Sequence, residues 1–145
     1  MKPLYSFVLA AFLPLAALAQ DAPAMAIVSG ADVVLADLMY VKRPVVVFAD
    51  SPNDPNFQRQ MGLLARDFAA LEARDVIVIT DTDPAAKSEI RTKLRPRGFS
   101  LVLMDKDWKP MIRKPLPWEG REIVNSIDKM PIARTEALEK NPAGR

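Results

Sequence analysis

The sequence contains no cysteine and no histidine among its 145 residues. The absence of cysteine excludes thiol nucleophiles, disulfides and thiolate-ligated metal sites. The absence of histidine excludes Ser-His-Asp triads, histidine acid–base catalysis and histidine-ligated zinc. Glycine motifs that cradle phosphates and the residue spacing of calcium-binding loops are missing as well. The sequence is half hydrophobic and 26% charged, which is the composition of one ordinary globular domain. We expect it to have no cofactor and no resident metal.

Residues 1–19 have the pattern of a signal peptide. Lys2 supplies a positive charge, and residues 4–18 are mostly apolar. Ala17-Leu18-Ala19 offers the small residues of a cleavage site. The apolar run is shorter than the about 20 residues that a membrane span needs, although an uncleaved anchor stays open as the alternative. We therefore expect an exported protein, located in a bacterial periplasm or secreted, with no stable membrane span after cleavage.

The expected mature chain is almost neutral. The whole sequence has 20 Lys and Arg against 18 Asp and Glu, which gives a formal net charge of +2. Removal of residues 1–19 takes away only Lys2, which leaves 19 basic and 18 acidic residues, or +1. Such a small charge does not favour nucleic-acid binding. The partner is expected to be an unknown protein or another envelope component, and the oligomeric state is left open.

Hydrophobic patterning predicts four strands and several helices. The strands are expected at residues 45–49, 76–80, 99–104 and 109–114, the last of them at a sheet edge. The helices are expected at 32–40, capped by Asp32, at about 54–71, from Asp83 to about 95, and at 117–130. The tail from Ile132 is expected to add a helical turn or two.

The helix after the first strand has the clearest apolar stripe. The stripe consists of Phe57, Met61, Leu64, Phe68 and Leu71, at spacings of 4, 3, 4 and 3. This spacing predicts one long helix that lies on a sheet and buries Phe68. Asp54-Pro55 ahead of it is typical of an N-cap followed by proline in the first turn.

The order strand, helix, strand, helix, hairpin, helix indicates the fold class. The first half is a right-handed βαβ crossover with parallel strands, and the second half is an antiparallel hairpin with a closing helix. This is an α/β, thioredoxin-like single domain, with a central mixed four-stranded sheet flanked by helices. We expect the domain at residues 40–136, between a lead-in with a short helix at 20–39 and a frayed tail at 137–145.

Several segments resemble one family. They are Arg43 to Ala49, the helix around Gln60, Arg74-Asp75-Val76, Leu103 to Asp107 and Ile127 to Arg134. The sequence resembles the family catalogued as domain of unknown function 4174, which occurs in bacterial exported proteins and in animal extracellular sushi-repeat proteins. The hairpin turn and the Asp-x-Met-Pro-x-x-Arg ending are the most specific parts. The resemblance implies a thioredoxin- or peroxiredoxin-like fold and an exported location, and it implies no catalytic residue.

Two departures from working thioredoxins bear on activity. Thioredoxins carry CxxC at the start of the helix after the first buried strand, whereas residues 50–55 here contain no sulfur. Thioredoxins also have a cis-proline just before the strand that follows the second helix, where this chain has Gly98-Phe99-Ser100. Disulfide exchange by this chain is therefore excluded. The leading hypothesis is a non-catalytic binding or structural module of the cell envelope.

Polar side chains follow both predicted parallel strands. They are Asp50, Ser51, Asn53 and Asp54 after the first strand, and Asp81, Thr82 and Asp83 after the second. Ligands of open α/β sheets usually bind at this end, and oxygen ligands suit calcium or magnesium. A divalent-cation-dependent enzyme is therefore one alternative. The simpler interpretation is that Asp54 and Asp83 cap helices and the other residues form turns.

A basic run and an aromatic patch are the other candidate sites. The run consists of Lys87, Arg91, Lys93, Arg95 and Arg97, and the patch of Trp108, Met111 and Trp118. The run predicts an envelope polyanion binder, unless these cations only complement a helix dipole. The patch would bind a partner if exposed, unless its side chains pack against the closing helix. Arg134 is expected to pair with Glu136 or Asp128.

Overall fold

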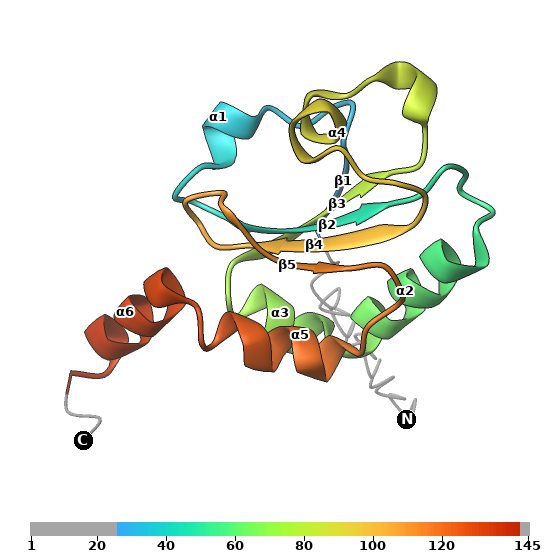
Figure 1. Cartoon of the computed structure of the whole chain (residues 1–145). Helices are drawn as coiled ribbons and strands as arrows, with labels where there is room; N and C mark the ends of the chain where they lie inside the picture. The colour runs from blue at the N-terminus through green and yellow to red at the C-terminus, as the bar shows by residue number, and fades with distance from the viewer. Residues whose placement is uncertain (1–25, 143–145) are drawn as a thin grey trace, which may run out of the picture.

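The computed structural model describes residues 26–142 and contains a five-stranded mixed sheet with helices on both faces (Figure 1). The strand order is β1-β3-β2-β4-β5, in which β1, β3 and β2 run parallel and β4 is antiparallel to both of its neighbours, β2 and β5. The predicted signal peptide and its cleavage site lie outside the described residues. Within residues 26–142, no helix has both the length and the apolar character that a membrane crossing requires.

The order of elements confirms the predicted thioredoxin-like α/β class. The strands are β1 (Ile27–Ser29), β2 (Arg43–Phe48), β3 (Val76–Asp81), β4 (Ser100–Met104) and β5 (Pro110–Lys114). The helices are α1 (Leu35–Leu38), α2 (Pro55–Arg66), α3 (Phe68–Glu72), α4 (Glu89–Leu94), α5 (Gly120–Ile127) and α6 (Pro131–Lys140), with a 3-10 turn η1 (Pro84–Ala86).

The sheet has one strand more than the four that were predicted. β1 pairs in parallel with β3, with Ile27 opposite Val78 and Ser29 opposite Thr80. This strand lies in the segment that was expected to be a lead-in. It was missed because three residues among small neighbours give no alternation or apolar run to read. β1 therefore extends the sheet beyond the predicted start of the domain.

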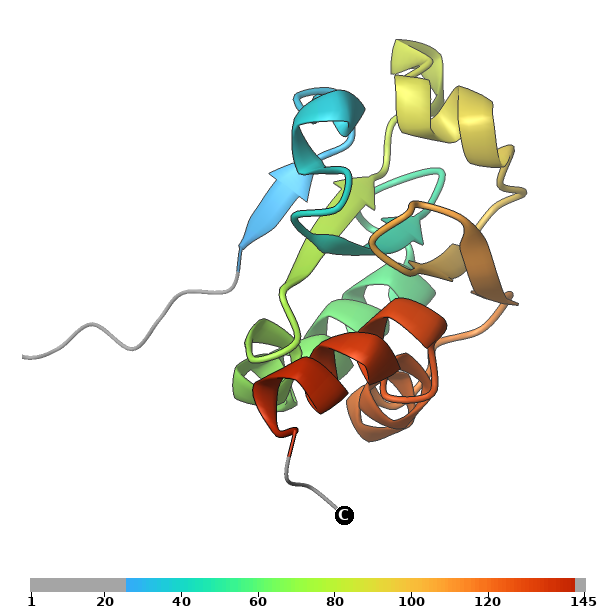
Figure 2. The same cartoon turned by 90° about the vertical axis from the view of Figure 1, so that its left-hand side faces the viewer.

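Two apolar clusters fill the two faces of the sheet. Val45 and Val47 of β2 pack on the side of α2, α3 and α5, whereas Val46 and Phe48 pack on the side of α1 and α4. All four side chains are at most 1% exposed. Figures 1 and 2 show helices on both sides of the strands. Because both faces are covered, β2 reads in the sequence as an unbroken apolar run.

One of the three predicted helix caps is found at its predicted helix. The Asp54 carboxylate accepts two backbone N–H groups in the first turn of α2, at 2.8 and 3.3 Å. Asp83 caps only the short η1, because Lys87 takes a left-handed conformation that ends this turn. α4 begins later and is capped by Ser88. The prediction that Asp32 caps the first helix is wrong, since α1 begins without a side-chain cap.

The long helix predicted after β2 is divided in two. Asp67, with φ −111°, separates α2 from α3, and its side chain lies against Gly120 at the start of α5. Leu64 and Leu71 of the predicted stripe are buried in the core. Phe68, however, is only partly buried. The regular spacing assumes one continuous helix, whereas the helix is interrupted at Asp67, directly before Phe68.

The C-terminal segment is more helical than predicted. α5 begins at Gly120 and buries Ile123, Val124 and Ile127. α6 then continues to Lys140, into the tail that was expected to fray. No residue of α6 is buried, so apolar packing alone does not hold this helix against the domain.

Candidate functional site

The carboxyl ends of β2 and β3 lie side by side, but the carboxylate between them is already neutralised. Asp81 is 6% exposed, and Arg91 donates to its Oδ1 from Nε and Nη2, at 3.1 and 2.9 Å. The Ser88 hydroxyl donates to the other oxygen. Burial disfavours the charged carboxyl, but the hydrogen bonds from Arg91 and Ser88 outweigh it and lower the pKa of Asp81 below its usual range. The buried carboxylate of the predicted cation site is thus bound to a guanidinium.

The remaining members of the predicted acidic loop form caps and turns. Asp54 and Asp83 cap α2 and η1. Ser51 accepts the backbone N–H of Asn53 at 3.1 Å, and Asp50 is exposed to solvent. Among residues 26–142, no three potential metal ligands of the Asp, Glu, His and Cys types lie together. Within these residues, the structure therefore shows no set of ligands for a cation-dependent enzyme. It favours the interpretation that these side chains form helix caps and turns.

The basic run predicted as one face is divided in the structure. Arg91 turns inward and also donates to the carbonyl of Ala49 at 2.9 Å, which ties α4 to the end of β2. Lys87 and Lys93 are exposed. Arg95 and Arg97, by contrast, line a pocket together with residues of β4 and β5.

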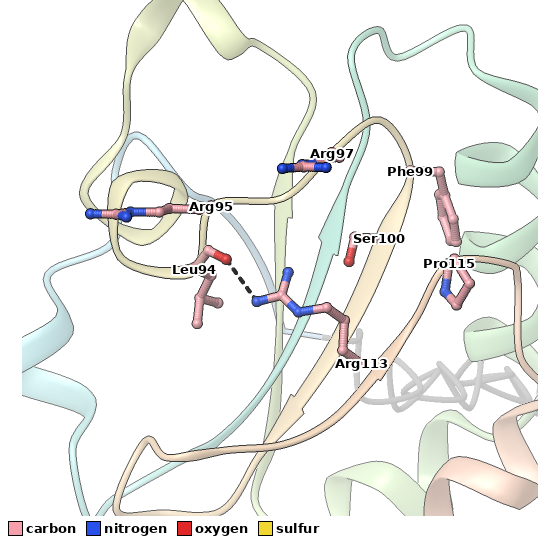
Figure 3. Close-up of a pocket in the computed structure, with 7 residues that line it drawn as sticks. All are labelled: Leu94, Arg95, Arg97, Phe99, Ser100, Arg113 and Pro115. Carbon is pink, nitrogen blue, oxygen red and sulfur yellow. Dashed lines mark hydrogen bonds between the residues drawn. The ribbon is translucent and has the colours of Figure 1, made fainter.

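We call this the arginine pocket. It opens between the end of α4 and the adjoining ends of β4 and β5, with a volume of about 480 Å³ (Figure 3). Its lining residues are Leu94, Arg95, Arg97, Phe99, Ser100, Arg113 and Pro115. None of them is acidic. The sequence indicated only two of the three arginines, because Arg113 lies on a different element and no spacing rule connects it to α4.

Two left-handed turns and the register of β4 and β5 form the pocket. Arg95 and Gly98 have φ of 48° and 57°, and together they reverse the chain between α4 and β4. Arg113 pairs with Val102 across the β4–β5 hairpin. Side chains alternate between the faces of a strand, so Arg113 and Ser100 project toward the face that carries α4.

Hydrogen-bond donors with few partners converge on the arginine pocket. Arg113 Nη2 donates to the carbonyl of Leu94 at 2.7 Å, which satisfies one free carbonyl at the end of α4. A guanidinium has five N–H donors, and this is the only hydrogen bond that the Arg113 side chain makes in the part of the chain that the structure describes. In Figure 3 the guanidinium groups of Arg97 and Arg113 and the Ser100 hydroxyl surround the same opening, whereas Arg95 extends away from Ser100.

Ser100 is the buried polar residue of the pocket. Its residue is 4% exposed, and its hydroxyl makes no hydrogen bond with another described residue. Within residues 26–142, no fully buried side-chain nitrogen or oxygen lacks a partner. The Ser100 hydroxyl is therefore not fully shielded from solvent, and Ser100 is one of the residues that line the arginine pocket.

The predicted aromatic patch is not a patch. Trp108 is 1% exposed, packs in the cluster under α1 and α4, and donates from its indole to the carbonyl of Lys42 at 3.3 Å. Trp118 is partly buried, with the ammonium of Lys114 at 4.5 Å from its ring. Only Met111 is well exposed, at 48%. The hypothesis of an exposed partner patch at Trp108 is therefore wrong: Trp108 has a left-handed backbone (φ 59°), and its ring is buried. Its packing on the α4 side also excludes the alternative contact with α5.

A second polar cluster lies at the opposite end of the sheet, and we call it the Arg43 cluster. Its members are Arg43, Asp75, Asp105, Lys106 and Glu136. Arg43 Nε lies 3.0 Å from Asp105 Oδ1, and Arg43 Nη2 lies 3.0 Å from Glu136 Oε2. Lys106 Nζ lies 2.8 Å from Asp75 and 2.5 Å from Glu136. These residues come from most of the segments that resemble the family, so those segments meet in space.

The Arg43 cluster fastens α6 to the sheet. Glu136 belongs to α6, and Asp105 Oδ2 also accepts the N–H of Ile132 at 3.0 Å. Burial raises the pKa of Glu136, but the hydrogen bonds from Lys106 and Arg43 outweigh it, and the pKa is lowered from its usual value. Because the described donors and acceptors satisfy one another, we interpret this cluster as structural rather than as a ligand site.

The predicted salt bridge of Arg134 is not formed. Asp128 pairs instead with Arg74 at 2.6 Å, and Glu136 pairs with Arg43 and Lys106. Arg134 is exposed on α6. Sequence proximity suggested a pairing within the helix, whereas partners from distant strands took both carboxylates.

Fold and site together define a thioredoxin-fold protein that has arginines rather than cysteines near the end of β2 and the start of β4. The chain belongs to the family described as "Domain of unknown function (DUF4174)", whose model matches residues 34–136. No protein with a curated description matches the chain.

Solved structures of thioredoxins and peroxiredoxins share the fold. Chloroplastic thioredoxin z is 19% identical, with a TM-score of 0.56 over 75% of this chain and 98% of that one. Thioredoxin peroxidase I of Plasmodium yoelii is 15% identical, with a TM-score of 0.51 over 75% of this chain and 81% of that one. At these identities the likeness shows the fold alone.

Proposed function

We propose that this protein is an exported, non-catalytic binding module of the cell envelope, and that it binds an anionic ligand in the arginine pocket. The observation that carries the proposal is the convergence of Arg97, Arg113 and the Ser100 hydroxyl on one pocket without an acidic lining residue. Guanidinium groups bind carboxylates and phosphates through paired hydrogen bonds.

The place of the arginine pocket in the fold supports a binding role. Ser100 begins β4 and pairs with Phe48 at the end of β2. Ligands of open α/β sheets usually bind beyond the carboxyl ends of the parallel strands, and Phe48 is the last residue of β2. This is also the end at which thioredoxins carry their cysteines. The family fold would thus keep a binding region there and use guanidinium groups in place of thiols.

The side chains of the pocket support binding without catalysis. Arginine stays protonated and donates hydrogen bonds only, so it cannot act as a general base. A serine nucleophile needs a neighbouring base, and none of the lining residues of the pocket is one. The chain also has no cysteine or histidine. An extended polyanion is a weaker candidate than a small anion, because Arg91 turns inward and the predicted basic face is broken.

Export is part of the proposal and rests on the sequence. The signal-peptide pattern of residues 1–19 supports it, and so does the exported location that the family resemblance implies.

Anion-dependent stability tests the proposed function. Protein beginning at Gln20 would be unfolded with urea in phosphate, citrate or chloride at equal ionic strength. An anion that binds only the folded protein, at 100 times its Kd, adds about 2.7 kcal/mol to the free energy of unfolding. The double variant Arg97→Gln/Arg113→Gln should lose this increase.

A matched control separates the pocket from general charge effects. Arg59→Gln/Arg121→Gln removes the same charge from two exposed arginines outside the pocket. This variant should keep the anion-dependent increase. The same response in both double variants, or none in the parent protein, would contradict anion binding in the arginine pocket.

A further inference from the structure

The arginine pocket is larger than the space that a simple inorganic ion occupies. Its volume of about 480 Å³ lies in the range of small-molecule sites, which are about 300–1,000 Å³. An inorganic anion held by Arg97 and Arg113 would leave much of this space unfilled. A ligand that fills the pocket therefore carries a further group beyond its charged part.

One end of the pocket is apolar. In Figure 3 the rings of Phe99 and Pro115 are drawn at one side of the opening and the guanidinium groups of Arg97 and Arg113 at the other, with Ser100 between them. Phe99 is 8% exposed, so its position is fixed by the core behind it. A ring or apolar group of a ligand could thus pack on one wall of the pocket, and a charged group could bind at the other.

The polar end of the pocket offers hydrogen-bond donors and positive charge in excess. Arg97 and Arg113 face the opening, and Arg95 adds a third positive charge at the edge. The Ser100 hydroxyl can donate as well. A phosphate monoester has three terminal oxygens and a charge of about −1.5 to −2 at pH 7, whereas a single carboxylate has two oxygens and one charge. The phosphate matches this set of donors better.

Building on the proposed function, we infer that the ligand of the arginine pocket is a phosphate monoester that carries a ring or apolar group. The dianionic phosphate lies between Arg97, Arg113 and the Ser100 hydroxyl, and the ring or apolar group packs on Phe99 and Pro115. Free phosphorylated small molecules and phosphorylated groups on larger molecules share this chemistry.

Phenyl phosphate is a simple probe that combines both groups. Its affinity would be measured by isothermal titration calorimetry with protein beginning at Gln20, at constant ionic strength, beside inorganic phosphate and benzoate. We expect phenyl phosphate to bind at least tenfold more tightly than either. Comparison of phosphotyrosine, which carries the same phenyl phosphate group, with a short phosphotyrosine peptide then separates a free small molecule from a modified protein as the source.

The pH dependence of binding identifies the charge of the ligand. The second pKa of a phosphate monoester is about 6, and the chain has no histidine or cysteine side chain that would titrate near it. If the dianion binds, the affinity for phenyl phosphate should rise about tenfold from pH 5 to pH 7. Benzoate, which is already ionised at pH 5, should show almost no change.

Two variants assign the two ends of the pocket. Arg97→Gln/Arg113→Gln should lower the affinity for phenyl phosphate at least tenfold, and Arg59→Gln/Arg121→Gln should leave it unchanged. Phe99→Leu keeps an apolar core residue and removes the ring, so it should reduce phenyl phosphate binding toward that of inorganic phosphate. Urea unfolding would verify that each variant is folded.

The outcomes distinguish this inference from the proposed function. Benzoate binding as tightly as phenyl phosphate, without a pH dependence, would overturn the phosphate assignment and leave anion binding intact. Inorganic phosphate binding as tightly as phenyl phosphate would overturn the apolar part. Binding of none of the three anions, or equal binding by the Arg97→Gln/Arg113→Gln variant, would overturn both the inference and the proposed pocket.

Discussion

Replacement of Arg43 should destabilise the protein far more than replacement of another paired arginine. The Arg43 side chain is 1% exposed, and it contacts Asp105, which is 3% exposed, and Glu136. Arg43→Met keeps most of the length of the side chain but removes the charge. Asp105 then remains buried without its counter-ion.

The expected cost follows from burial. Removal of one partner from a buried ion pair typically costs about 3–5 kcal/mol, because the other charge stays uncompensated. Asp105 keeps the N–H groups of Lys106 and Ile132, at 2.9 and 3.0 Å. We therefore expect a loss at the lower end of this range, about 3 kcal/mol.

Arg74→Met is the matched control. Arg74 pairs with Asp128 at 2.6 Å, but the two side chains are 30% and 51% exposed. Exposed ion pairs contribute about 0–1 kcal/mol, so this variant should change stability by no more than that.

Urea unfolding with a common m-value measures both losses. Because Glu136 and Ile132 belong to α6, Arg43→Met should also speed hydrogen exchange of the α6 amides before the core exchanges. Equal losses for the two variants, or an α6 that stays protected in Arg43→Met, would refute the structural role of the Arg43 cluster.

Three further predictions concern other parts of the chain. The fully buried Gln60 side chain accepts the N–H of Trp118 at 2.7 Å and donates to its carbonyl at 2.9 Å. Gln60→Leu should lower the free energy of unfolding in urea by about 1–3 kcal/mol, and an equal loss for Gln58→Leu, at an exposed position of the same helix, would contradict this. Folding lowers the pKa values of Asp75, Asp81 and Glu136, so the stability that these carboxylates contribute is complete above their unfolded pKa values of about 4 and is lost as the pH falls through the lowered values. Glu136→Gln should therefore make the loss of stability at acid pH shallower in melts between pH 6 and 2, and an unchanged slope would argue against this. Protein recovered from the periplasm should begin at Gln20 by intact mass, and a mass that retains residues 1–19 would indicate an anchor.

The sequence was most informative where local pattern and tertiary environment agree. β2, β3 and β4 were predictable because strands that are covered on both faces are unbroken apolar runs. The Asp54 cap was predictable because an N-cap and a following proline act within a single turn. β1 was not predictable, since its pairing with β3 gives it its structure and its own three residues carry no pattern.

The candidate site was only partly predictable, because its chemistry depends on distant partners. Arg91 and Arg95 lie on the same short stretch of chain, yet one neutralises Asp81 and the other lines a pocket. Arg113 joins that pocket from β5. Trp108 belongs to a turn, where exposure is usual, but its ring is buried in the cluster beneath α1 and α4. None of these relations is encoded in residue spacing.

Chemical-shift mapping of the backbone amides would show directly whether the arginine pocket binds an anion. Isotope-labelled protein beginning at Gln20 would be titrated with phenyl phosphate and, separately, with benzoate at constant ionic strength. We expect saturable shifts that are largest at Arg97, Phe99, Ser100 and Arg113. Shifts spread over exposed basic residues outside the pocket, or no saturable shift with either anion, would contradict it.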